Sequence, residues 1–199
     1  MTSPPNAGVV KVGVLLAEPS DLGGWLADAA AFDTSGADAL WLDVPPHGPL
    51  DPFALAAALA ALTFRALLVT PLPALGGDGR ASARTLATIG RLSRGRLAVH
   101  GEAHQAADIA SAGGTEAASW PVFRPLGAGL FVRTAAAGGQ ERWARTAAPR
   151  DRAAWRASLA DAAASGIGGL LVPAEDRLID LLRNPGDTAD RRDLDLAQG

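Results

Sequence analysis

The stretch ALWLDVPPHGPLDPFALAAALAALTFRALLVTP, residues 39–71, decides the fold of this chain. The apolar runs at its two ends are typical of strands that are buried on both faces. Between them, Asp51 is a good helix N-cap and Pro52 suits the first helical position, so a helix is predicted that ends near Thr63. Strand, helix and strand in this order indicate a parallel unit with a right-handed crossover.

The same alternation extends to both sides of this unit. Strands are predicted at 9–16, 39–44, 65–71 and 96–100, and helices at 21–35, 51–63 and 82–92. Four short buried strands that alternate with three helices fit either a barrel or an open doubly wound sheet.

The second half of the chain is less regular. Strands are predicted at 121–125, 129–134 and 168–172, and helices at 106–112, 150–165 and 176–183. The total of about seven strands is one short of a closed eight-stranded barrel. We expect one domain over 1–185, followed by a charged, disordered tail at 186–199.

Composition narrows the functional classes. A chain of 199 residues with a formal net charge of -3 suits one domain, and it lacks the basic excess typical of nucleic-acid-binding proteins. The absence of Cys excludes disulfides, thiolate metal sites and Cys nucleophiles. Residues 1–8 do not have the pattern of a signal peptide, and no apolar run is long enough to span a bilayer. We therefore expect a cytoplasmic protein that binds neither nucleic acid nor membrane.

Residues 36–99 contain an ordered series of short motifs. A Gly-Ala-Asp run leads to an aromatic residue, an acid and a histidine; Asp-Pro then opens an Ala/Leu-rich helix, and a later helix ends in Leu-Ser-x-Gly-Arg. The residues concerned are Gly36, Asp38, Trp41, Asp43, His47, Asp51, Pro52, Thr63, Arg65, Leu92, Ser93, Gly95 and Arg96. In order and spacing this stretch resembles the luciferase-like flavin-dependent monooxygenase family.

The resemblance implies a TIM-barrel-like α/β fold with parallel strands. Because the chain is much shorter than full members of the family, we expect an incomplete or truncated barrel of a shortened, divergent member. Such a member would bind reduced FMN or F420 at the carboxyl ends of its strands and oxidise a small organic substrate. The alternative is a catalytically degenerate subunit of the same fold that binds flavin, or one that has lost the cofactor and acts through protein contacts.

His47 and Asp43 are the catalytic residues that the resemblance implies. His47 follows the second strand, and a histidine there can exchange protons near neutral pH. Asp43 ends the second strand and could orient His47 or fix the flavin. The alternatives are a loop histidine without a role and a carboxylate bonded to backbone amides.

The cofactor-binding residues implied by the resemblance are Thr70, Pro71, His100, Gly101 and Glu102. The family places a backbone bulge under the flavin ring where Thr70 and Pro71 end the third strand. The fourth strand usually ends in Gly, but here His100 has that position and Gly101 comes one residue later. An ordinary strand exit is the alternative at Pro71.

Three further patterns have competing interpretations. His100, Glu102 and His104 could ligate a metal or lie in a solvated loop, and the glycine-rich loop at 76–79 could bind phosphate or be a linker. Arg142, Arg145, Arg150, Arg152 and Arg156 could bind an anion, or form a helix surface paired with nearby carboxylates. The small residues of the 51–62 helix could pack within the chain or form a homodimer or heterodimer interface.

Overall fold

The structure is a computed structural model that describes residues 9–45, 48–72, 79–113, 120–134 and 139–187. Its strands are β1 (Lys11–Ala17), β2 (Ala39–Asp43), β3 (Leu67–Pro71), β4 (Leu97–His100), β5 (Val122–Gly127), β6 (Leu130–Thr134), β7 (Gln140–Arg145) and β8 (Gly169–Pro173). Its helices are α1 (Leu22–Ser35), α2 (Pro52–Leu62), α3 (Gly79–Leu92), α4 (Ala103–Gly113), α5 (Arg152–Ala164) and α6 (Asp176–Arg183). The strands form a closed barrel in chain order.

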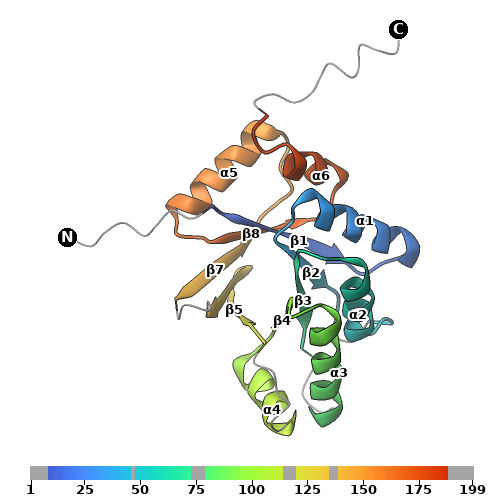
Figure 1. The fold of residues 1–199 in the computed structure, drawn as a ribbon. Helices are drawn as coiled ribbons and strands as arrows, with labels where there is room; N and C mark the ends of the chain where they lie inside the picture. Colours follow the sequence, from blue (N-terminus) through green and yellow to red (C-terminus); the bar gives the residue numbers. More distant parts are fainter. Residues whose placement is uncertain (1–8, 46–47, 73–78, 114–119, 135–138, 188–199) are drawn as a thin grey trace, which may run out of the picture.

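Most neighbouring strands of the barrel run parallel. β1 to β5 form a continuous parallel series, and β7, β8 and β1 continue it on the other side. β6 runs antiparallel to both of its neighbours, β5 and β7. Figure 1 shows helices α1 to α4 along the parallel half, and the described residues between β5 and β7 contain no helix.

The TIM-barrel-like α/β fold expected from the sequence is confirmed, with two corrections. The barrel is not truncated, because an eighth strand, β7, closes it, and not all of the strands are parallel. β7 has the sequence QERWAR, which contains no apolar run, so its pattern did not indicate a buried strand. Its inward residues Glu141 and Arg145 are charged and find partners at the two ends of the barrel.

Aromatic rings fill the centre of the barrel. The interior cluster consists of Leu15, Ala39, Trp41, Val69, Ala98, Phe123, Phe131, Trp143 and Leu171. Trp143 lies across two glycines, because a Cβ added at Gly169 would come within 2.3 Å of its ring and one at Gly13 within 2.9 Å. Trp41 is fully buried in this interior cluster, whereas Trp155 is buried in the outer layer between strands and helices.

Charged side chains close the end of the barrel where the parallel strands begin. Glu141 accepts hydrogen bonds from Lys11 Nζ at 2.8 Å and from Arg133 Nε at 2.6 Å. Arg133 also lies over the ring of Phe123, with 5.2 Å between its guanidinium carbon and the ring centroid. These ion pairs occupy this end of the barrel, which is called the closed end below.

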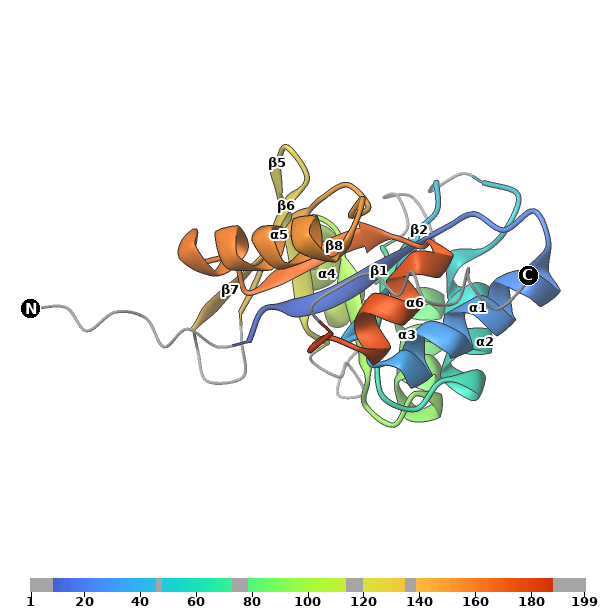
Figure 2. The ribbon, with the colours of Figure 1, turned by 90° about the horizontal axis from the view of Figure 1, so that it is seen from above.

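The described residues contain no helix that is both long enough and apolar enough to cross a membrane. Disorder is expected for the tail at 186–199, and from residue 188 onward this tail lies outside the described ranges. Figure 2, seen from above, shows α5 beside β8, while α6 lies next to α1.

Candidate functional site

The mouth of the barrel, defined here by Asp43, Pro71, His100 and Arg145, brings together residues from four strands. Each is the last residue of its strand, in β2, β3, β4 and β7. Alternation along each strand places them on the same inner side as the central aromatic cluster. Ligand sites of TIM barrels lie at this end of the parallel strands, so the mouth is the candidate site.

Asp43 and Arg145 form a bidentate ion pair across the mouth. Arg145 Nη1 donates to Asp43 Oδ2 at 3.0 Å, and Nη2 donates to Oδ1 at 2.5 Å. Their strands are not neighbours, since β1 and β8 lie between them in the barrel. The two side chains are 40% and 38% exposed, so the pair is open to solvent and to ligands.

The β5–β6 hairpin positions Arg145. Residues Gly127, Ala128 and Gly129 all have positive φ, at 87°, 50° and 73°, which makes the turn tight. The Arg145 amide donates to the Gly129 carbonyl at 2.8 Å. A Cβ at Gly129 would lie 3.1 Å from the Arg145 Cβ, so the glycine gives room to the arginine stem.

His100 forms the floor of the mouth. Its ring stacks on Trp41 with 5.0 Å between centroids and 27° between planes, and its Nε2 lies 3.4 Å from the Leu42 carbonyl oxygen. Burial lowers the pKa of His100 to about 4 and outweighs the opposing effects of the Leu42 carbonyl and Asp43. The imidazole is therefore neutral near pH 7.

The other cofactor-binding residues implied by the resemblance are Thr70, Pro71, Gly101 and Glu102, and they differ in burial and in the direction they face. Thr70 is fully buried and its hydroxyl faces α2, 3.5 Å from the Pro52 carbonyl. β3 and β4 pair in continuous register through Thr70 and Pro71, so these paired residues contain no bulge of the kind that the resemblance implies. Gly101 lies against Leu72, where a Cβ would come within 3.1 Å, and Glu102 is exposed.

Two predicted sites involve residues outside the described ranges. His47, the first-ranked catalytic residue, is one of them, and most of the glycine-rich loop at 76–79 is another. For the alternative metal site, His100 is buried against Trp41 while Glu102 and His104 are exposed. The described part of the chain contains no group of three or more metal-ligating side chains.

A cavity of about 420 Å³ with both apolar and polar surface adjoins the mouth at Pro71. It is lined by Pro49, Leu50, Pro52, Phe53, Pro71 and Leu72, together with Gly48, Asp51 and Ser82. It lies where β3 ends and α2 begins, and its volume is within the range of small-molecule sites. The sequence indicated Pro71 here, but not the apolar wall that the loop before α2 supplies.

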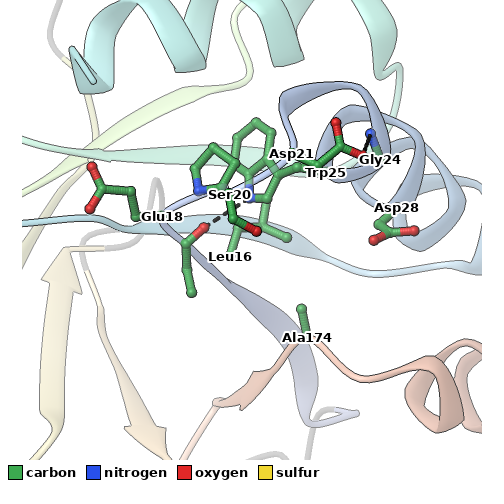
Figure 3. Close-up of a pocket in the computed structure, with 10 residues that line it drawn as sticks. Leu16, Glu18, Ser20, Asp21, Gly24, Trp25, Asp28 and Ala174 are labelled. Carbon is green, nitrogen blue, oxygen red and sulfur yellow. Dashed lines mark hydrogen bonds between the residues drawn. The ribbon is translucent and has the colours of Figure 1, made fainter. Parts of the chain in front are cut away.

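A second cavity, of about 340 Å³, lies between the end of β1 and the start of α1 (Figure 3). Glu18, Asp21 and Asp28 contribute carboxylates to its lining, and the Trp25 indole donates to the Ala17 carbonyl at 2.9 Å. Asp21 also caps α1 by accepting from the amides of two residues of its first turn. Its acidic lining makes this cavity unsuitable for a phosphate-bearing ligand.

Two arginines of the arginine-rich segment pair with carboxylates that lie far from them in the sequence. Arg145 reaches Asp43 in the mouth, and Arg152 is buried and bonds to Asp180 Oδ2 at 2.5 Å. The sequence indicated Arg145 only as one of five arginines that could bind an anion, and it did not place this residue at the end of a strand. The signal that could have identified it is the two-residue alternation of Glu141, Trp143 and Arg145, which places all three inside a barrel.

Comparison with known proteins leaves the activity unassigned. No family model and no curated protein matches the sequence. Among solved structures, this chain is similar to the aminoacrylate-bound form of tryptophan synthase from M. tuberculosis. The TM-score is 0.44 and the identity 18%, over 87% of this chain and 86% of that chain. The oxygenating constituent of 3,6-diketocamphane monooxygenase from Pseudomonas putida, a type II Baeyer-Villiger monooxygenase in complex with FMN, matches with a TM-score of 0.39 and 16% identity.

The second match is partial, since it covers 47% of this chain and 29% of the monooxygenase chain. This chain thus spans less than a third of that structure. Many unrelated enzymes share the TIM-barrel fold, so the fold alone does not specify a reaction.

Proposed function

We propose that this chain binds reduced FMN or F420 at the mouth and acts as a luciferase-like flavin-dependent oxidoreductase on a small organic substrate. The observation that carries the proposal is the cavity beside Pro71, which adjoins the mouth residues. A flavin ring is planar and largely apolar, and walls of proline, leucine and phenylalanine suit such a ring. The sequence resemblance supplies the cofactor class.

The residues around the cavity fit a phosphorylated flavin. The cavity of about 420 Å³ offers an apolar wall for the ring, and Arg145 in the mouth offers a guanidinium for a phosphate. When bound, the flavin would supply the electrons for the oxidation. The chain would bind and orient the cofactor, and the packed centre of the barrel would exclude water from below.

Proton handling in this proposal falls to His47 and Asp43, as the resemblance implies. Asp43 is held in place by the bidentate ion pair with Arg145. His100 is neutral near pH 7 and can exchange a hydrogen bond with a ligand without adding charge to the mouth. The mouth therefore contains both the Asp43 carboxylate and the neutral His100 ring.

The test is a titration of the protein with FMN and F420, followed by fluorescence quenching, on the native chain and on a variant with a filled cavity. Ser82 lines the cavity from α3, so we expect Ser82→Phe to abolish binding. Thr88→Phe, on an exposed position of the same helix, is the matched control and should bind normally. Equal binding by both variants would contradict the proposed location.

A catalytic role of His47 has a separate test. We expect His47→Ala to lose turnover while flavin binding stays intact, with His104→Ala, an exposed histidine on α4, as the control. Unchanged turnover in His47→Ala would remove that residue from the proposal.

A second candidate is a flavin-binding or partner subunit without catalysis of its own. Two observations favour it: His100 fills the position that the resemblance gives to glycine, and Arg145 engages the Asp43 carboxylate. Its partner, a second copy or a related chain, would pack on the 51–62 region, where the less buried face of α2 consists of Ala54, Ala57, Ala58, Ala61 and Leu62. A folded dimer that binds neither flavin would support the partner role.

A further inference from the structure

We infer that Arg145 is the anion-binding residue of the mouth, and that a carboxylate or phosphate group of the ligand takes the place of Asp43 in its ion pair. The inference deepens the proposed function and rests on it, because it takes the mouth as the ligand site. It adds the chemical class of the ligand and a reason for the ion pair.

The geometry of the pair is that of ligand recognition. The two guanidinium nitrogens of Arg145 donate to the two oxygens of Asp43, at 3.0 and 2.5 Å. Phosphate and carboxylate groups of ligands accept from a guanidinium in this same two-pronged way. Asp43 thus has the position and the charge that a ligand oxyanion would have.

Exposure separates Arg145 from the structural arginines of the fold. The Arg145 side chain is 38% exposed, whereas Arg133, paired with Glu141, is 16% exposed and Arg152, paired with Asp180, is 4% exposed. A ligand can therefore reach Arg145 without disturbing the core. Its partner Asp43 is equally accessible, at 40%.

The exchange costs little because it replaces one oxyanion with another. Asp43 is the one ion-pair partner of Arg145 found within the described residues, and the floor beneath it is the neutral ring of His100 on Trp41. A ligand anion would keep Arg145 fully hydrogen-bonded. It would also release the Asp43 side chain from Arg145, so that this carboxylate can turn toward the ligand.

Asp43 competes with the ligand in this arrangement, so the two partners of one ion pair should have opposite effects on binding. We would titrate Asp43→Asn, Arg145→Gln and the native chain with FMN, riboflavin, inorganic phosphate and acetate. FMN and riboflavin differ only in the phosphate group. We expect Asp43→Asn to bind FMN roughly tenfold more tightly and Arg145→Gln roughly tenfold more weakly, with riboflavin unchanged.

The phosphate and acetate titrations distinguish the two sources of the oxyanion. Tighter binding of phosphate alone by Asp43→Asn identifies a phosphate site, and tighter binding of acetate alone identifies a carboxylate site. Lys11→Gln, which removes an ion pair at the closed end of the barrel, is the matched control and should bind all four probes normally.

The outcomes separate this inference from the proposed function. If flavins do not bind but phosphate or acetate affinity changes in opposite directions in the two variants, the anion site holds and the flavin proposal fails. If FMN binds equally to all variants, the flavin proposal stands and the inference is overturned. Weaker binding in both variants, or no anion binding to any of them, would also overturn it, since a purely structural ion pair predicts the same direction for both.

Discussion

His100 shows how one side chain couples the mouth to the stability of the barrel. Burial against Trp41 lowers its pKa from 6.5 to about 4. The unfolded chain therefore takes up a proton near pH 6.5, whereas the folded chain does so only near pH 4. Stability attributable to His100 is complete above pH 6.5 and decreases as the pH falls from about 6.5 to about 4, by about 3 kcal/mol in total.

We expect His100→Gln to flatten the pH dependence of the free energy of unfolding over this interval, as measured by urea denaturation between pH 4 and 7. His104→Gln is the control, because His104 is exposed on α4 and its removal should leave the curve of the native chain intact. A His100→Gln curve that is parallel to that of the native chain would show that the imidazole is not held neutral by burial.

At the scale of the element, β7 packs against β8 only because residue 169 of β8 is a glycine, which leaves room for the Trp143 ring. A Cβ at Gly169 in β8 would come within 2.3 Å of the Trp143 ring, far inside van der Waals contact. We expect Gly169→Ala to destabilise the fold by about 1–3 kcal/mol, since the indole cannot move within a packed interior. Thermal unfolding followed by circular dichroism measures the loss.

Two further variants make this prediction specific. Gly139→Ala is the control, because nothing lies within 4 Å of its added Cβ. In the background Trp143→Leu, Gly169→Ala should cost much less than in the native chain, because the smaller side chain leaves room for the methyl group. Equal losses in both backgrounds would mean that the indole is not the obstacle.

At the scale of the whole molecule, Glu141 links the two halves of the barrel across its closed end. It joins Lys11 of β1 to Arg133 of β6 and is only 14% exposed. Glu141→Gln would leave two cations close together without their shared counter-charge. We expect a loss of about 2–3 kcal/mol in the free energy of unfolding. Urea denaturation measures this loss, because urea is uncharged and does not screen the ion pairs.

Glu175→Gln provides the comparison, because Glu175 is exposed and makes no side-chain cap for α6. It should leave stability unchanged. A Glu141→Gln protein as stable as Glu175→Gln would indicate that Lys11 and Arg133 find other partners at the closed end.

The sequence predicted the parallel half of this barrel well, because its strands are buried on both faces. Apolar runs such as 39–44 and 65–71 reveal such strands directly, and Asp51 marks the start of α2 as predicted, accepting from the Phe53 amide at 2.7 Å. The closing strand was missed for the opposite reason, since β7 has charged residues on its inner side.

The candidate site was predictable only where it depends on strand ends. Asp43, Pro71 and His100 end apolar strands, and their meeting at one end of a barrel follows from the parallel order. Arg145 could not be placed without β7, and its pairing with Asp43 depends on closure between residues that lie far apart in the sequence.

Closure of the ring also sets the order of events during synthesis. β1, made first, pairs with β8, whose partner residues are separated from it by most of the sequence. The strands β1 to β4 can assemble as they emerge from the ribosome, but Trp143 meets Gly13 only after the later strands have been made. Until then the nascent sheet has an open edge at β1, whose unpaired backbone groups can pair with the strand of another chain.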